Sequence, residues 1–219
     1  MLTDLKLDAL PELTYDPRSQ RWRYRDSRQF ASMSAVRVQS ERYIKAESES
    51  LQKLGRDFTD SKVSLSEFQR LAAQHVKHIH LGQAITALSK QSDLSPEIFL
   101  EVGRQLKKQY HAGRDWQTGK SYGLKYLAKD MQAGKVSPAQ LQHRLTMFAN
   151  SGAKSYWGVK HILAIRDGYT EARRVLGLAE HCLECVIMAG QGWKPIQEIT
   201  PIGERCSCRS NCKCSIKYR

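Results

Sequence analysis

The stretch Leu51-Gln-Lys-Leu-Gly-Arg-Asp-Phe-Thr-Asp-Ser-Lys-Val-Ser64 returns later in the chain as Leu124-Lys-Tyr-Leu-Ala-Lys-Asp-Met-Gln-Ala-Gly-Lys-Val-Ser137. The two copies align without a gap. In each, the apolar positions fit the end of an amphipathic helix, and the final serine can cap the next helix. The repeat predicts two similar helical hairpins that pack together. The alternative is that the same helix–loop–helix chemistry recurs by chance.

Helical signals extend from both copies along most of the chain. We expect helices over 33–59, 65–90, 96–110 and 154–176. Glu67 three residues after Ser64 is typical of a capping box, and Gly177 is suited to close the last helix. Little before residue 178 has the pattern of a strand. The predicted fold class is mainly α, with helical hairpins packed as a bundle.

The first 32 residues are predicted to be an extended N-terminal arm. Pro11 and Pro17 interrupt any helix, and the run Arg18-Ser-Gln-Arg21-Trp22-Arg23-Tyr24-Arg25 mixes basic and aromatic side chains without apolar periodicity. We expect Arg21, Trp22 and Arg23 to contact a neighbouring subunit, or alternatively a phosphate backbone. The domain organisation is therefore an arm (1–32), a helical body (33–177) and a small C-terminal module (178–219).

The charge of the chain is strongly positive and unevenly placed. The 219 residues include 35 Lys and Arg against 22 Asp and Glu, a net charge of +13. Most of the excess lies in 101–150 and 201–219. A local excess of this kind favours docking to an acidic partner, although a lysine-rich solvated helix face is the alternative for 101–150.

Two cellular destinations find no support in the sequence. No apolar run approaches the roughly 18 residues that a membrane-spanning helix needs. The opening residues Met1-Leu-Thr-Asp4 do not resemble a secretory signal. We therefore expect no membrane partner and thiols that are reduced at synthesis.

All the cysteines of the chain lie after residue 181, in the C-terminal module. Their pattern is Cys182-x2-Cys185-x20-Cys206-x-Cys208-x3-Cys212-x-Cys214. A close pair followed by a second group can complete a tetrahedral zinc site. The preferred ligands are Cys182, Cys185, Cys208 and Cys212, with Cys206 and Cys214 as alternates and His181 as a weaker candidate. Trp193 could cover the site.

Other fates of the cysteines stay open. Six cysteines allow many disulfide pairings that sequence cannot resolve, and simple packing of reduced thiols is also compatible with the pattern. A catalytic zinc would need an open coordination position and a general base. Glu184 and Glu198 are available, but nothing in the sequence places either of them as that base. The pattern therefore favours structural zinc.

The C-terminal segment resembles the end of phage minor head proteins of the Mu F-like group. The likeness rests on Cys182-x2-Cys185, a glycine-containing stretch with Trp193, and Asn211-Cys-Lys-Cys214 before Ile216 and Tyr218. Tyr24-Arg-Asp26 followed by Phe30 also resembles openings of phage head-gene products. One departure is Arg209-Ser210, where the family often has His-Pro. A cysteine could replace that histidine as a ligand.

The resemblance implies a structural minor head protein of a tailed bacteriophage. Such a protein would be assembled in the host cytoplasm and found in the virion, at the head or portal vertex, in several copies. Its partners would be the portal or major capsid protein, with packaged DNA as a further contact. Some family members carry toxin domains, but this chain shows no such domain, so the resemblance does not imply an enzyme.

Two other functions are compatible with parts of the sequence. The first is a zinc-containing nucleic-acid-binding protein, in which Arg205, Arg209, Lys213 and Lys217 would contact the nucleic acid. The second is an enzyme, suggested by His75, His78 and His80 on one predicted helix. Histidines in that pattern are more typical of a polar helix face, and the sequence has no phosphate loop, serine elbow or His-Glu-x-x-His motif.

Overall fold

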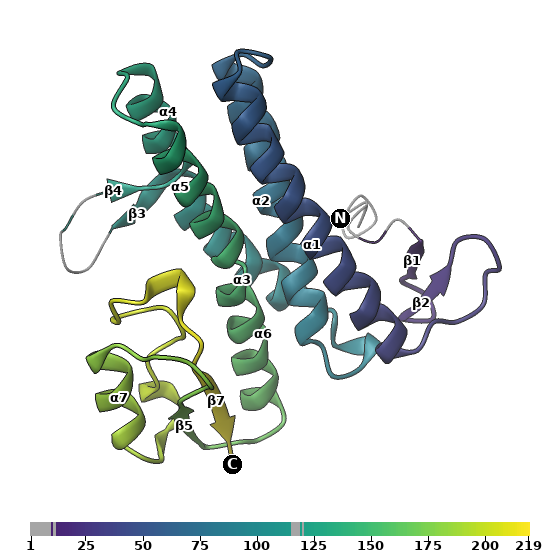
Figure 1. Cartoon of the computed structure of the whole chain (residues 1–219). Coiled ribbons are helices and arrows are strands. Elements are labelled where there is room, and N and C mark those ends of the chain that lie inside the picture. Colours follow the sequence, from purple (N-terminus) through teal and green to yellow (C-terminus); the bar gives the residue numbers. More distant parts are fainter. Residues whose placement is uncertain (1–9, 11, 115–118, 120) are drawn as a thin grey trace.

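The computed structural model describes residues 10, 12–114, 119 and 121–219, and it confirms the prediction of a mainly α fold (Figure 1). The helices are α1 (Met33–Thr59), α2 (Leu65–Ala87), α3 (Pro96–Lys107), α4 (Leu124–Gln132), α5 (Pro138–Asn150), α6 (Ala153–Arg166) and α7 (Leu183–Gly190). The strands are short: β1 (Leu13–Asp16), β2 (Arg21–Tyr24), β3 (Gly113–Arg114), β4 (Ser121–Tyr122), β5 (Glu171–Val175), β6 (Lys194–Pro195) and β7 (Ser215–Tyr218).

The two copies of the repeat form the α1–α2 and α4–α5 connections. Ser64 Oγ accepts a hydrogen bond from the backbone N–H of Glu67 at 3.2 Å, and Ser137 Oγ accepts one from Gln140 at 3.3 Å. The capping box is complete only in the second copy, where the Gln140 side chain accepts from the Ser137 N–H. In the first copy the Glu67 carboxylate instead pairs with Arg70 at 2.7 Å.

The leucines of the repeat lie in one buried cluster. Leu51 and Leu54 come from α1, and Leu124 and Leu127 come from α4. The cluster also holds Phe68 from α2, so that both helical connections contribute to the same hydrophobic core. Contacts between α1 and α5 and between α2 and α4 complete the packing.

The N-terminal segment is a β-hairpin and not the extended arm that the sequence predicts. β1 and β2 pair antiparallel, with Tyr15 opposite Trp22. Leu13 and Trp22 are fully buried in a hydrophobic cluster with residues from α1, α2, α3 and α6. The apolar residues of this segment are few, but they gain a core by packing onto the helical body. Residues 1–9 and 11 of the expected arm lie outside the described residues.

The helix predicted over 154–176 ends ten residues early, at Arg166. A turn through Gly168, with a left-handed φ of 87°, leads into β5. β5 is the central strand of a sheet of order β6-β5-β7, and both neighbours run antiparallel to it. Ala172 and Arg174 point to the buried side of this sheet. Because β5 is hydrogen-bonded to β6 and β7, it belongs to the C-terminal module. The module therefore begins before the predicted boundary at residue 178.

Two of the three α2 histidines form a polar face. The Nδ1 atoms of His75 and His78 lie 2.6 and 3.1 Å from the carboxylate of Glu47 on α1. Both rings and the carboxylate are partly buried between the helices. These histidines therefore link α1 to α2.

His80 is fully buried and hydrogen-bonded at both ring nitrogens. Its Nε2 lies 3.0 Å from Ser151 Oγ and its Nδ1 lies 2.7 Å from Ser155 Oγ. Because the Ser151 hydroxyl donates to the carbonyl of Phe148, it accepts from His80 Nε2–H. Ser155 then donates to Nδ1, so the neutral imidazole satisfies every partner.

Acid is expected to destabilise the helical body through His80. Burial, with a smaller contribution from the nearby Lys154 charge, lowers the pKa of His80 from 6.5 to about 3. The unfolded chain therefore binds a proton below about pH 6.5 that the folded chain does not bind. The stability that this group contributes is present above pH 6.5 and is lost progressively toward pH 3, by at most about 1.4 kcal/mol per pH unit.

The measurement is the free energy of urea unfolding, followed by far-UV circular dichroism between pH 7 and pH 4. We expect the His80→Asn variant to be less stable at pH 7 but to lose stability less steeply with acid. His143→Asn, at an exposed position on α5, is the control and should keep the wild-type slope. Equal slopes for wild type and His80→Asn would contradict the assignment.

Candidate metal centre

The elements of the C-terminal module bring all the cysteines together. Cys182 is the N-cap residue of α7 and Cys185 lies in its first turn, so both face one side of the helix. Cys206 and Cys208 lie in the loop between β6 and β7, and Cys212 and Cys214 lead directly into β7. Pairing of β7 with β5 holds this last segment beside α7 (Figure 1).

The sulfur atoms lie at distances typical of metal ligands. Cys208 Sγ lies 3.6 Å from Cys182 Sγ and 3.5 Å from the Sγ atoms of both Cys185 and Cys206. Cys212 Sγ lies 3.7 Å from Cys185 Sγ. All six residues are free thiols, so none of these contacts is a disulfide. In a tetrahedral zinc site with Zn–S of about 2.3 Å, neighbouring sulfurs lie about 3.8 Å apart. The cluster therefore fits a metal ion.

The grouping of the cysteines differs from the preferred ligand set. Cys182, Cys185, Cys206 and Cys208 form one group, whose sulfur atoms lie within 4.8 Å of one another. A second group within the same limit consists of Cys185, Cys212 and Cys214. Cys206, proposed only as an alternate, thus takes the place of Cys212 in the first group.

The thiols of the cluster differ in acidity. Hydrogen bonding from Cys206 lowers the pKa of Cys212 to about 4, and the same hydrogen bond raises the pKa of Cys206. Burial raises the pKa of Cys185 and that of Cys208, the latter to about 11. Binding of a metal to the protonated thiols releases their protons. We therefore expect the metal affinity to decrease as the pH is lowered.

Arg174 is the functional residue that sequence reasoning missed. Its side chain is only 2% exposed, and one guanidinium nitrogen lies 3.7 Å from Cys212 Sγ and 4.0 Å from Cys185 Sγ. A second nitrogen donates to the carbonyls of Thr200 and Pro201. A buried guanidinium needs negative charge nearby, and the thiolates of a metal-bound cluster would supply it.

Trp193 does not cover the cysteines as expected. Its ring lies between two guanidinium groups, 4.9 Å from that of Arg173 and 4.5 Å from that of Arg219. Lys217 on β7 is directly opposite Arg173 on β5. One face of the sheet is therefore basic and aromatic, while the other face holds Arg174 and the cysteines.

The residues predicted to contact a partner fall into two separate regions. Arg205, Arg209, Lys213 and Lys217 are exposed and alternate with the cysteines of the C-terminal module. Arg21 and Arg23 belong to the N-terminal hairpin, which lies on the other side of the helical body (Figure 1). Their guanidinium groups stack on the Phe30 ring at 3.9 and 4.1 Å.

The predicted contact through Trp22 is wrong for its side chain. The ring has no exposed surface and lies in the core between the hairpin and the helices. It therefore cannot reach a base or a neighbouring subunit in this fold. Its role is to attach the hairpin to the helical body.

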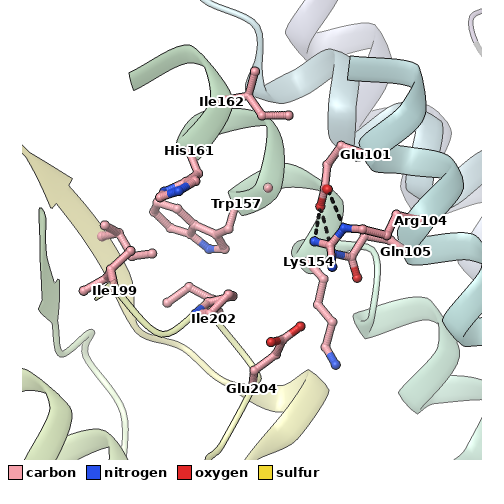
Figure 2. A pocket seen from close by; sticks show the side chains of 13 residues that line it. Glu101, Arg104, Gln105, Lys154, Trp157, His161, Ile162, Ile199, Ile202 and Glu204 are labelled. Atoms are coloured by element: carbon pink, nitrogen blue, oxygen red, sulfur yellow. Dashed lines mark hydrogen bonds and ion pairs between the residues drawn. The ribbon is translucent and has the colours of Figure 1, made fainter. Parts of the chain in front are cut away.

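A small cavity marks the joint between the helical body and the C-terminal module. Figure 2 shows Trp157 of α6 pointing toward Ile199 and Ile202 of the module, with Lys154 and Glu204 at one end. Glu204 also accepts from Lys108 Nζ at 3.0 Å, which ties the module to the end of α3. The cavity measures about 110 Å³. Ligand sites usually measure about 300–1,000 Å³, so this space is suited to a few water molecules.

In the described part of the chain, no helix combines the length and apolar character needed to cross a membrane. Comparison of the sequence and the fold with protein-family models, curated proteins and solved structures finds no match.

Proposed function

We propose that this chain is a structural minor head protein of a tailed bacteriophage, with zinc holding its C-terminal module together. The observation that carries the proposal is the convergence of the cysteines. Cys185 lies against Cys212 and Cys214, although these residues are well separated from it in the sequence. These cysteines belong to the motif that resembles the Mu F-like group. The two ends of the motif, which are far apart in the sequence, therefore lie together. This arrangement supports a single structural role for the motif.

The chemistry of the cluster supports a structural ion. Cys185 and Cys206 have no exposed surface, and Cys214 has little. Thiolate ligands favour zinc among the common divalent ions, and a site with four protein ligands leaves no position open for a substrate. The ion would join α7, the loop after β6 and the start of β7.

The outer face of α7 supports docking to another protein. Leu183, Val186 and Ile187 are 71%, 47% and 55% exposed, on the helix whose other side carries the buried Cys185. Exposed apolar side chains gathered on one short helix are typical of a contact surface. In the proposed function this helix contacts the portal or the major capsid protein.

The proposal is tested by the composition of phage heads. We expect the chain to sediment with head-sized particles from a producing lysate, at a fixed ratio to the major capsid protein. The Ile187→Asp variant should lose this association, because it places a charge in the docking face. Leu100→Asp, at an even more exposed apolar position on α3, should keep it. Absence of the chain from both heads and assembly intermediates would contradict the proposal.

A zinc-containing nucleic-acid-binding protein is the second candidate. It is favoured by the basic face of the sheet, where Arg173 and Arg219 contact the Trp193 ring and Lys217 lies opposite Arg173. Binding through several phosphate contacts would weaken steeply as the salt concentration rises. Retention on duplex DNA with that salt dependence, reduced in Lys217→Ala, would support this function. Negligible retention at low salt would exclude it.

A further inference from the structure

We propose that the C-terminal module binds two zinc ions, which share the thiolate of Cys185 and use His181 as the seventh donor. The proposal rests on the metal-holding role proposed above and goes beyond it in the number of ions, the bridging ligand and the histidine. The donors of both ions belong to one cluster of side chains, from α7 and the segments that precede β7.

The first ion has a complete set of four cysteine donors. Cys182, Cys185, Cys206 and Cys208 have sulfur atoms within 4.8 Å of one another. The three shortest contacts, each made by Cys208, measure 3.5 to 3.6 Å. These distances are close to the edge of a zinc–sulfur tetrahedron, about 3.8 Å.

The second ion is held by the group that shares Cys185 with the first. Cys185, Cys212 and Cys214 form the second group, with 3.7 Å between the sulfurs of Cys185 and Cys212. His181 Nδ1 lies 3.6 Å from Cys214 Sγ. With Zn–S of about 2.3 Å and Zn–N of about 2.0 Å, a tetrahedral site separates sulfur and nitrogen by about 3.5 Å. The distance from Cys214 is that of two donors to one zinc ion, which makes His181 the candidate for the fourth donor.

The number of donors fits two ions better than one. Two tetrahedral ions have eight coordination positions, and six cysteines with one histidine supply seven donors. Cys185 belongs to both groups, and one shared thiolate fills the remaining position. A single ion in the first group would leave Cys212 and Cys214 buried beside it without a ligand role.

The hydrogen bond at the far side of the His181 ring prepares Nδ1 for a metal. Nε2 lies 2.9 Å from the carbonyl oxygen of Gly177, which can only accept a hydrogen bond. Nε2 therefore carries the proton, and the lone pair of Nδ1 points toward Cys214. Metal-binding histidines almost always have such a carbonyl or carboxylate partner on their other nitrogen.

The position of Gly177 ties this arrangement to the cysteines. A side chain at Gly177 would clash with the backbone carbonyl of Lys213, the residue between Cys212 and Cys214. The carbonyl that holds His181 is thus packed directly against the segment that supplies two of the donors. Histidine and cysteines are fixed relative to one another by backbone contacts.

Charge balance is also favourable. Two divalent ions and six thiolates leave two negative charges in a largely buried cluster. The Arg174 guanidinium lies 4.0 Å from Cys185 Sγ and 3.7 Å from Cys212 Sγ, beside the proposed bridge and one ligand of the second ion. It offsets one of the two charges without exposure to solvent.

The direct test uses the wild-type full chain loaded with ¹¹³Cd²⁺, which replaces zinc in thiolate sites. We expect two cadmium resonances, and we expect the β-protons of Cys185 to correlate with both. Zinc content after purification should be two ions per chain. One cadmium resonance with one zinc per chain would overturn the binuclear proposal and leave the single structural ion standing. No metal at all would overturn both.

Variants assign the second ion. His181→Ala is expected to reduce the zinc content from two ions to one, because the first group keeps its four cysteines. His143→Ala on α5 is the matched control and should retain two. Two tightly bound ions in His181→Ala would show that the histidine is not a ligand. If that variant fails to fold, the cadmium spectrum of the wild-type chain decides between one and two ions.

Discussion

Removal of the metal by a chelator is expected to unfold residues 171–219 and to leave the helical body folded. Four of the ten buried residues in the core of the module are cysteines, and the others are small or aliphatic. A module of this size buries too little apolar surface to be stable without a metal or disulfides. For structural zinc, binding supplies about 10–16 kcal/mol of folding free energy in small domains. The two clusters of the body contain no cysteine.

The loss is measured by limited trypsin digestion of the full chain with and without EDTA. Arg205, Arg209 and Lys213 are exposed cleavage sites among the ligands. Each 1.4 kcal/mol of lost stability raises the open population about tenfold, so cleavage should accelerate by orders of magnitude. Far-UV circular dichroism should retain most of its helical signal.

A ligand substitution should reproduce the effect of the chelator. We expect Cys208→Ser to be cleaved rapidly even with zinc present, because Cys208 contacts three other sulfurs. Ser210→Ala, two residues away, is the matched control and should be cleaved at the wild-type rate. Resistance to trypsin that survives EDTA but disappears with a reductant would mean that disulfides hold the module instead.

Trp22→Ala is expected to lower the free energy of unfolding of the helical body by about 3–5 kcal/mol, the usual cost of truncating a buried tryptophan. The Trp22 ring is fully buried and lies 5.3 Å from the Tyr15 ring across the hairpin. It packs into the cluster that includes Val36 of α1 and Leu88 after α2. The substitution removes the largest buried side chain that the hairpin contributes to this cluster.

Urea unfolding followed by far-UV circular dichroism measures this effect. Arg21→Ala is the matched control, because it changes the preceding residue of the same strand on its exposed side, and it should cost less than about 1 kcal/mol. If Trp22→Ala retained wild-type stability and only impaired head association, Trp22 would be a contact residue after all.

The helical body could be predicted because its signals are local. The serines at 64 and 137 cap helices through residues three positions later, and the leucine spacing lies within single helices. Local patterns could not reveal that the helices bury one side of the N-terminal hairpin. Trp22 is flanked by arginines and looks like an exposed residue in the sequence, whereas its burial depends on helices that begin much later in the chain.

The sheet of the C-terminal module was missed for a related reason. The segment Glu171-Ala-Arg-Arg-Val175 follows a helix closely, and its arginines are typical of a helix C-terminus. Its partner strand β7 lies about forty residues further along, so no local pattern shows the pairing. The helix predicted over 154–176 therefore includes Arg174 in its last turn, away from the cysteine cluster.

The cysteine spacing predicted that the ligands would gather but not how they would divide. Cys206-x-Cys208 and Cys212-x-Cys214 have the same spacing, and either pair could complete a site with Cys182 and Cys185. The choice is made by the path of the loop between β6 and β7 and by the docking of β7 on β5. It groups Cys206 with Cys182, Cys185 and Cys208, and Cys212 with Cys185 and Cys214.

β5 is synthesised well before its partner strand β7, so the C-terminal module is completed late in protein synthesis. The helical body precedes both strands and can fold while the ribosome is still making the module, as N-terminal units generally do. β5, Cys182 and Cys185 then emerge well before the cysteines at 206–214 and the strand that completes the sheet. Until those residues follow, the first cysteine pair is exposed to oxidation and to competing metals. If the module holds zinc as proposed, its loading is therefore a late step, which depends on the supply of zinc in the cell at that moment.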